Sequence, residues 1–179
     1  MSPSLQPCVF FDRDGIANVG PSPGEYYVLS PERLFIIPEF LEALQIVTDR
    51  GFEAVIVTNQ YGIAKGLLSP ATLDAIHARL HAAVTGAGLR LLDIYTCPHG
   101  DNHPDRKPNP GMLLRAARDH GLDFARSWMI GDHVRDIQAG RAAGCAVTVF
   151  VHEQEACALA DYHVRGMAAL PEFLRHKLP

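Results

Sequence analysis

Short apolar runs that end in polar residues constrain the fold of this chain more than any other feature. The run 9–11 leads directly into Asp12 and Asp14, and the run 53–57 leads into Thr58. Continuous apolar runs of this length are typical of parallel strands that are covered on both faces. Because the carboxyl ends of parallel strands meet at one edge of a sheet, we expect these polar residues to gather there.

Segments with helical spacing lie between these runs. Apolar residues recur every three or four positions after Pro38 and again after Ser69, where a capping serine precedes a first-turn proline. The predicted strands are 9–11, 53–57, 92–96, 127–130, 146–151 and a short one from 162, and the predicted helices are 38–50, 70–84, 112–120, 134–143 and a closing helix that ends near 178. This alternation predicts a three-layer, Rossmann-like α/β fold, a mostly parallel sheet with helices on both faces and no large cap domain.

Size and charge narrow the class of partner. The chain has 179 residues, 47% of them hydrophobic, so we expect residues 1–179 to form a single domain. A net charge of -4 without a basic stripe argues against nucleic acid or an anionic membrane as partner and favours a small phosphorylated metabolite once the motifs below are considered. The first seven residues lack the features of a signal peptide, and no apolar run could span a bilayer, so we expect a cytoplasmic protein, with a monomer as the default.

Polar groups follow four of the expected strands. They are Asp12 and Asp14, Thr58 and Asn59, Arg106 and Lys107, and Asp132 and Asp136. Alternation along an extended chain would point Asp12 and Asp14 the same way, so that their carboxylates could share one cation or one phosphate. Two acidic pairs suit Mg²⁺, which prefers oxygen ligands, and a lysine with a hydroxyl completes a phosphate cradle. Such groups favour phosphoryl transfer, for which a covalent aspartyl-phosphate is one route.

In this order, Asp12-Arg13-Asp14-Gly15, Thr58, Lys107 and the segment 131–136 resemble the four motifs of haloacid dehalogenase (HAD) superfamily phosphatases. The resemblance implies that Asp12 is the nucleophile and Asp14 the general acid and then base. It implies that Mg²⁺ is held by Asp12, the main-chain carbonyl of Asp14 and Asp132. Thr58 and Lys107 would bind the transferring phosphoryl group, and Asp136 would orient Lys107.

Two longer stretches resemble a capless branch of that superfamily, which contains heptose bisphosphate phosphatases and histidinol phosphatases. They are residues 57–66, and residues 97–99 followed by 106–112. The resemblance implies a small phosphorylated sugar as substrate, first of all heptose 1,7-bisphosphate, with histidinol phosphate or another phosphomonoester as the alternative. The substrate-binding residues that it implies are Asn18 and Tyr27 in a loop 18–31 over the site, Asn59, Gln60, Arg106, and Asp136 through Lys107.

Metal ligands other than those for Mg²⁺ are less well marked. The structural zinc of the branch would need Cys97, His99, His103 and Asp105 here, because His-Pro-Asp stands where the branch has Cys-x-Cys. One thiolate instead of three weakens a soft-ligand site, so a loop held by hydrogen bonds is the alternative. The pair His77 and His81, one helical turn apart, is interpreted as a solvated helix face, since no acidic third ligand lies nearby.

A catalytically silent binding domain is the alternative from a different functional class. Such a domain would have the same fold but would hydrolyse no phosphate ester. Every acidic residue and the lysine of the four motifs are present, which disfavours it. The sequence therefore predicts an Mg²⁺-dependent phosphoric monoester hydrolase.

Overall fold

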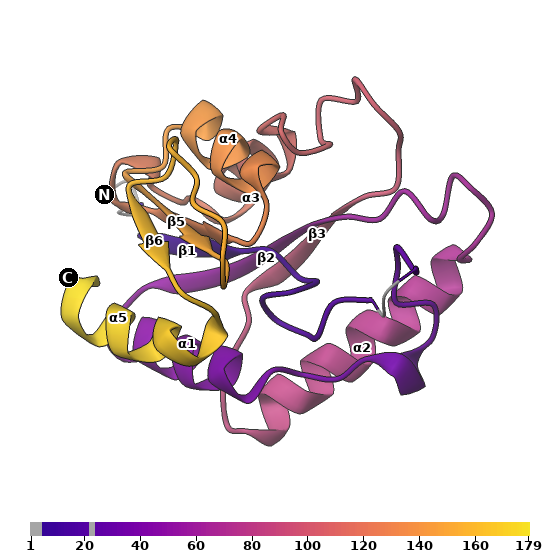
Figure 1. Ribbon diagram of the computed structural model, residues 1–179, viewed down its shortest axis with the longest axis horizontal. Helices are drawn as coiled ribbons and strands as arrows, with labels where there is room; N and C mark the ends of the chain where they lie inside the picture. The colour runs from indigo at the N-terminus through magenta and orange to yellow at the C-terminus, as the bar shows by residue number, and fades with distance from the viewer. Residues whose placement is uncertain (1–4, 22–23) are drawn as a thin grey trace.

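A six-stranded sheet, in which every strand runs parallel to its neighbours, forms the centre of the computed structural model (Figure 1). The structure describes residues 5–21 and 24–179. The strand order is β3-β2-β1-β4-β5-β6, with β1 (Cys8–Phe11), β2 (Glu53–Asn59), β3 (Asp93–Cys97), β4 (Trp128–Gly131), β5 (Val147–Val151) and β6 (Tyr162–Val164). The prediction of a parallel α/β sheet is confirmed.

Helices cover both faces of the sheet. Figure 1 shows α3 (Gly111–His120) and α4 (Val134–Ala143) on one face, and α1 (Pro38–Asp49), α2 (Pro70–Gly86) and α5 (Leu170–Lys177) on the other. These bounds agree with the predicted helices to within about two residues. Gly121 and Gly144 end α3 and α4 in the left-handed conformation, with φ of 65° and 91°, which glycine adopts without the steric cost of a Cβ atom.

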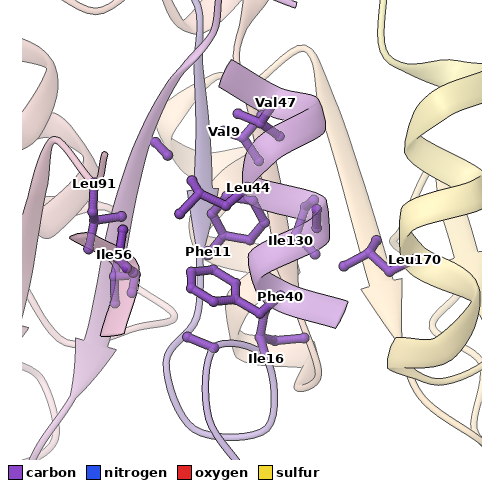
Figure 2. Close-up of a cluster of buried hydrophobic side chains, with 14 of the residues drawn as sticks. Val9, Phe11, Ile16, Phe40, Leu44, Val47, Ile56, Leu91, Ile130 and Leu170 are labelled. Carbon is purple, nitrogen blue, oxygen red and sulfur yellow. The ribbon is translucent and has the colours of Figure 1, made fainter. Parts of the chain in front are cut away.

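Two apolar clusters fill the space between the layers. Alternate residues of β1 point to opposite faces, so Val9 and Phe11 join the cluster under α1 while Phe10 joins the one under α3. Figure 2 shows the first cluster, in which Phe11 meets Phe40 of α1 edge to face, with ring centroids 5.4 Å apart. Burial of each such side chain contributes about 1.5–3 kcal/mol, so the clusters hold the strand ends rigidly in place.

The helix α2 is positioned by its first turn and by one apolar face. Ser69 caps it, because its Oγ accepts a hydrogen bond from the backbone N–H of Thr72. The four residues that the spacing predicts to face inward are all buried: Leu73, Ile76, Leu80 and Val84. One side of α2 therefore packs against the sheet, and its neighbouring side approaches the loop that follows β1 (Figure 1).

The loop that follows β1 at the carboxyl edge of the sheet contains no inserted domain among its described residues. In the described part of the chain, the segment between β1 and α1 contains only the 3-10 turn η1 (Pro31–Arg33), as expected for a fold without a large cap. Residues 1–4 and 22–23 lie outside the described residues. The first group belongs to the start of the chain, where the sequence predicts no signal peptide, and the second belongs to the predicted loop 18–31. No helix within 5–21 and 24–179 has the length and apolarity needed to cross a bilayer.

The strand order decides where a ligand can bind. The chain passes from β1 to β2 on one side and later returns to β4 on the other side of β1. In an open parallel sheet, this reversal of direction leaves a crevice at the carboxyl ends of the central strands. Asp12 follows β1 and Asp132 follows β4, so both lie at that crevice.

Candidate active site

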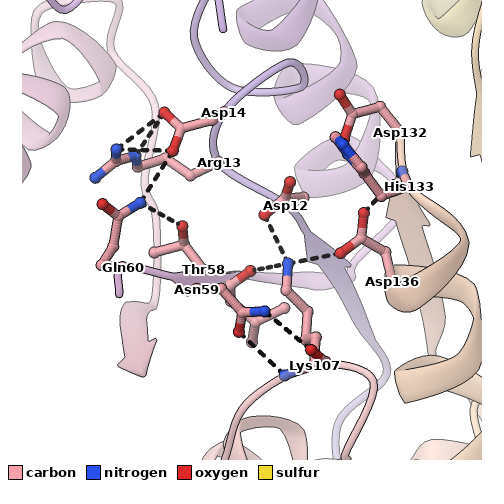
Figure 3. Close-up of polar contacts among 11 residues, drawn as sticks. Asp12, Arg13, Asp14, Thr58, Asn59, Gln60, Lys107, Asp132, His133 and Asp136 are labelled. Carbon is pink, nitrogen blue, oxygen red and sulfur yellow. Dashed lines mark hydrogen bonds and ion pairs between the residues drawn. The ribbon is translucent and has the colours of Figure 1, made fainter. Parts of the chain in front are cut away.

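A buried lysine bridges two buried carboxylates at the crevice (Figure 3). The Nζ atom of Lys107 lies 2.6 Å from Oδ1 of Asp12 and 2.7 Å from Oδ1 of Asp136, and it donates a third hydrogen bond to the carbonyl of Val57 at 2.8 Å. The three charged side chains are at most 6% exposed. A charged cluster removed from water is costly to form unless each charge is paired, and this geometry pairs all three.

The pKa values of the pair Asp12 and Lys107 reflect this burial. Burial raises the pKa of Asp12, and the negative charge of Asp136 adds to that effect, while the ammonium of Lys107 opposes it. Burial alone would lower the pKa of Lys107, but the two carboxylates beside it outweigh burial and raise it. Lys107 is therefore held as a positive charge between the two carboxylates.

Asp132, which follows β4, lies with Asp12 in a group of possible metal ligands. Ligand atoms of Asp12, Asp132, His133 and Asp136 all lie within 4.8 Å of one another, the one such group in the described part of the chain. His133 Nδ1 lies 2.8 Å from Oδ1 of Asp132, which raises the pKa of His133 by that hydrogen bond. One carboxylate oxygen of Asp136 pairs with Lys107, and the other accepts a hydrogen bond from the backbone N–H of His133. The carboxylate oxygens that remain available for a hard cation therefore come from Asp12 and Asp132.

Asn59 holds the backbone of the lysine loop. Its Nδ2 donates to the carbonyl of Lys107 and its Oδ1 accepts from the N–H of Lys107, both at 3.0 Å. The strand β2 extends two residues beyond the predicted run because Thr58 and Asn59 pair with Thr96 and Cys97 of β3. The end of β2 thus places the hydroxyl of Thr58 at the crevice and clamps the loop that carries Lys107.

The carboxylate of Asp14 points away from that of Asp12 (Figure 3), so the prediction that the two side chains point the same way is wrong, and Asp14 is not part of the group of possible metal ligands found among the described residues. Asp14 accepts hydrogen bonds from Arg13, Asn18 and Gln60 at 2.8–3.1 Å. Asp14 follows the end of β1 in a tight turn, so the alternation of an extended strand no longer applies. Burial would raise the pKa of Asp14, but Arg13 and the hydrogen bonds together lower it.

Two of the predicted substrate-binding residues support Asp14 from inside the protein. Asn18 and Gln60 are fully buried, and each turns its amide nitrogen to the Asp14 carboxylate. Gln60 also donates to Oγ1 of Thr58 at 2.9 Å. The amide oxygens of Asn18 and Gln60 have no hydrogen-bond donor among the described residues, so the demand of the carboxylate for donors decides how both amides are oriented.

A cavity of about 540 Å³ opens above these groups. Its lining residues include Asp12, Asp14, Thr58, Asn59, Lys107 and Asp132 from the motifs, Gly20, Pro21, Glu25, Tyr26 and Tyr27 from the loop after β1, and also Arg106, His133 and Arg135. Of the predicted substrate-binding residues, Tyr27, Asn59 and Arg106 line the cavity. Asn18, Gln60 and Asp136 do not line the cavity.

Comparison with known proteins identifies the family. A sequence model described as HAD-hydrolase-like matches residues 105–166. The D-glycero-beta-D-manno-heptose-1,7-bisphosphate 7-phosphatase of Bordetella bronchiseptica is 39% identical over 140 residues, which are 77% of this chain and 76% of that protein. The Escherichia coli K12 protein of the same name is 34% identical over 187 residues, 94% of each chain. The chain belongs to the HAD phosphatase family.

Solved structures support the same assignment of this HAD phosphatase. The crystal structure of D,D-heptose 1,7-bisphosphate phosphatase from B. bronchiseptica, complexed with magnesium and phosphate, has a TM-score of 0.83 at 33% identity and covers 96% of this chain and 99% of that one. The corresponding protein from Burkholderia thailandensis has a TM-score of 0.69 at 28% identity, with 96% and 100% covered. The predicted capless HAD fold is therefore confirmed.

The predicted zinc ligands of this HAD phosphatase are not gathered into a metal site. No three of Cys97, His99, His103 and Asp105 offer ligand atoms within 4.8 Å of one another in the described residues. Oδ2 of Asp105 lies 2.8 Å from Arg115, the Nδ1 of His103 accepts from the N–H of Asp105, and the rings of His99 and His103 stack. The side chains of His99, His103 and Asp105 thus take part in an ion pair, a hydrogen bond and ring stacking.

The interpretation of His77 as part of a solvated helix face is wrong. His77 is half-buried, and its Nε2 lies 3.2 Å from NH1 of Arg13, whereas His81 is exposed. Sequence reasoning also missed Arg135, which lies within the motif segment 131–136 and lines the cavity, and Tyr26, which lines the cavity beside Tyr27. Arg135 could have been found from its place directly before Asp136, but the contact of His77 has no sequence signal.

Proposed function

We propose that this HAD phosphatase hydrolyses D-glycero-D-manno-heptose 1,7-bisphosphate at the 7-phosphate in an Mg²⁺-dependent reaction. The observation that carries the proposal is the pairing of Asp12 with Lys107 beside Asp132 at the base of a polar cavity. The relatives named for this activity match up to 94% of the chain at 33–39% identity, which supports the same substrate class here. We further propose that residues 1–179 act as one domain, in the cytoplasm.

The donor set at the cavity base fits Mg²⁺. Asp12 and Asp132 present carboxylate oxygens close together, and the main-chain carbonyl of Asp14 is the third ligand that the family pattern implies. The solved relative from B. bronchiseptica contains magnesium and phosphate. When bound, Mg²⁺ would neutralise charge on the phosphate and on the two carboxylates. We assign Asp12, Asp132 and the Asp14 carbonyl as its ligands.

Each side chain of the site has a separate role in the proposed two-step reaction. A carboxylate oxygen of Asp12 attacks phosphorus as the bond from phosphorus to the sugar oxygen breaks, and Asp14 gives its proton to that oxygen. Water next attacks the aspartyl-phosphate and loses a proton to Asp14, which releases phosphate and restores Asp12. The ammonium of Lys107 and the hydroxyl of Thr58 stabilise the negative charge on the phosphoryl oxygens throughout.

Asp14 must carry a proton in the first step although its pKa is lowered in the protein alone. A phosphate ester bound beside it adds negative charge, and a nearby like charge favours the protonated form of a carboxyl group. After the alcohol has left, Arg13, Asn18 and Gln60 favour the carboxylate that accepts a proton from water. The same residue can therefore act first as acid and then as base.

Two arginines that line the cavity suit a second phosphate. Arg106 and Arg135 both line the active-site cavity and an adjoining one of about 370 Å³. Arg106 is held by Asp101 and by the carbonyl of His99, and its guanidinium lies 5.2 Å from the ring centre of Tyr61. A sugar whose 7-phosphate lies at Asp12 would direct its 1-phosphate toward these arginines, which favours a bisphosphate over a monophosphate.

The zinc site is not part of the proposal. Asp105 is paired with Arg115 and His103 accepts from the backbone, so we propose that the loop 97–110 keeps its shape by these contacts. Metal analysis of protein purified without a chelator tests this. Stoichiometric zinc in that protein would contradict it.

The experiment that tests the function is a substrate panel. Purified protein with Mg²⁺ is assayed against heptose 1,7-bisphosphate in both anomers, heptose 7-phosphate, histidinol phosphate and common sugar monophosphates. We expect the highest kcat/KM for a heptose bisphosphate. Hydrolysis of histidinol phosphate at a higher kcat/KM, or of no ester at all, would refute the proposal.

The Asp12→Asn variant is the control for this panel. It keeps the shape of the side chain and removes the attacking charge, so turnover should be lost while the circular dichroism spectrum stays unchanged. Phosphate release at the wild-type rate in this variant would show that a contaminant or another group does the chemistry.

A further inference from the structure

The charge of Arg13 is removed from water between the active site and the helix α2. Its side chain is 0% exposed. The Nε and NH2 groups face the carboxylate of Asp14 at 2.8–3.1 Å (Figure 3), while NH1 faces away from the cavity and lies 3.2 Å from Nε2 of His77. A guanidinium group is rigid and planar, so the partner on one edge sets the orientation of the other edge.

His77 reaches this guanidinium from outside the active-site cavity. It comes from the second turn of α2, 64 residues further along the chain, and it does not line the cavity above Asp12. Arginine has only donors and stays protonated, so His77 must accept with a neutral Nε2 and carry its proton on Nδ1. Burial and the positive charge of Arg13 lower the pKa of His77 to about 4, which keeps the ring neutral at physiological pH.

We propose that His77 is a positioning residue for catalysis, which orients Asp14 through Arg13. By accepting from NH1, His77 fixes the plane of the guanidinium, and that plane fixes the Asp14 carboxylate within reach of the departing sugar oxygen. The inference rests on the proposed phosphatase function. The other donors to Asp14, Asn18 and Gln60, each contribute one hydrogen bond, whereas Arg13 contacts both carboxylate oxygens.

Removing the acceptor that His77 provides should displace the carboxylate of Asp14. Without His77, NH1 of Arg13 would be a buried donor without a partner, which is unfavourable enough that the guanidinium would turn toward another acceptor. A small displacement of a general acid lowers the rate because proton transfer needs the donor within hydrogen-bond distance of the leaving oxygen. The nucleophile Asp12 and the lysine that pairs with it do not contact His77, so their function should persist.

The leaving group of the substrate distinguishes a positioning role from a structural one. The His77→Leu variant is compared with wild type on a sugar phosphate, whose alkoxide needs a proton to leave, and on p-nitrophenyl phosphate, whose phenolate does not. The measured quantity is kcat/KM, which covers the steps up to departure of the alcohol. We expect a loss of about tenfold or more on the sugar phosphate and of less than about threefold on the aryl ester.

Two further variants serve as controls. His81→Leu changes an exposed histidine one turn along the same helix and should leave both kcat/KM values unchanged. In His77→Gln, the amide oxygen can take the place of Nε2 as acceptor, so this variant should recover most of the activity on the sugar phosphate. If His77→Leu does not fold, His77→Asn replaces it, because its shorter side chain cannot reach Arg13.

The outcomes distinguish a failure of the proposed role of His77 from a failure of the proposed phosphatase function. Equal losses on the two esters, no loss on either, or no recovery by His77→Gln would each overturn the role of His77 while the phosphatase function stands. Wild-type protein that hydrolyses neither ester in the presence of Mg²⁺ would overturn the function itself, and the inference with it.

Discussion

A Cβ atom at position 15 would lie 2.1 Å from Oδ2 of Asp132. Gly15 also has a φ of 95°, a conformation that side chains disfavour. The turn after β1 and the end of β4 therefore approach each other closely only because residue 15 has no side chain. This contact brings Asp132 toward Asp12 and builds the proposed metal site.

We predict that Gly15→Ala lowers kcat/KM at least about tenfold and raises the Mg²⁺ concentration needed for half-maximal activity, because Asp132 must move. Activity is measured as a function of Mg²⁺ concentration. Gly51→Ala is the matched control: its φ is 76° and nothing lies within 4 Å of the added Cβ, so it carries the backbone strain without the clash. Equal effects of the two substitutions on Mg²⁺ dependence would contradict this explanation.

Lys107→Met should abolish turnover and destabilise the protein. The substitution keeps the length of the side chain but leaves the buried carboxylates of Asp12 and Asp136 without their cation. We expect kcat to fall about 100-fold or more and the free energy of unfolding to fall by about 3 kcal/mol. Urea denaturation and steady-state kinetics measure the two effects.

The double variant Lys107→Met/Asp136→Asn separates these effects. Neutralising Asp136 should restore part of the stability, since one unpaired charge is removed, but it should restore no activity. Recovery of activity in the double variant would mean that Lys107 acts only on Asp136 and does not contact the phosphoryl group.

Magnesium should stabilise the wild-type protein through Asp12 and Asp132. These carboxylates lie close together and repel each other, so a cation that binds the folded state raises the melting temperature. We expect a rise in Tm on adding Mg²⁺ to chelator-treated wild type and little or none in Asp132→Asn. A rise of the same size in Asp132→Asn would place the cation elsewhere.

Arg135→Gln should affect bisphosphate substrates selectively. Arg135 is exposed and lines both the active-site cavity and the adjoining one, where the second phosphate is proposed to lie. We expect KM for the heptose bisphosphate to rise about tenfold, with little change in kcat or in KM for a sugar monophosphate. Arg118→Gln, an exposed arginine of α3 outside the cavity, is the control. Equal changes for both substrates would exclude a contact with the second phosphate.

His77 should make stability depend on pH in a defined window. Its pKa is about 4 in the folded protein and near the ordinary 6.5 when unfolded, so between these values the unfolded chain binds more protons. The stabilisation from neutral His77 is complete above pH 6.5 and is lost as the pH falls toward 4. His77→Gln should flatten this slope, by up to about 1.4 kcal/mol per pH unit.

Urea denaturation at several pH values between 4 and 7 checks this prediction. The groups that affect the pKa of His77 are Arg13, Asp14 and His81. His81→Gln should keep the wild-type slope because His81 is exposed. A slope that is unchanged in His77→Gln would mean that the ring does not stay neutral in the folded protein.

The order of strands and helices could be predicted because it depends on local pattern. Continuous apolar runs such as Val9–Phe11 are typical of a strand covered on both faces, and the period of the apolar residues of α2 is typical of a helix with one buried side. The motif residues could be placed at one sheet edge because parallel strands share their direction. Asp12, Thr58, Lys107 and Asp132 therefore meet where the sequence predicts.

The direction of individual polar side chains could not be predicted in the same way. Asp14 turns away from Asp12 because the chain leaves the strand at that point, and because Arg13 and Asn18 of the same turn and Gln60, which follows β2, donate to its carboxylate. His77 meets Arg13 across 64 residues, and Asp105 pairs with Arg115. Such contacts depend on which donors and acceptors packing brings together.

The sequence alone thus determined the fold class, the edge of the sheet that carries the site and the residues of the four motifs, since apolar periodicity and motif order are local properties of the chain. Only the tertiary structure decided that the carboxylate of Asp12 faces Lys107 while that of Asp14 faces Arg13, and which arginines line the cavity. The physical reason is that a buried charge takes the partner that packing places within about 3 Å, and that partner can come from any distance along the chain.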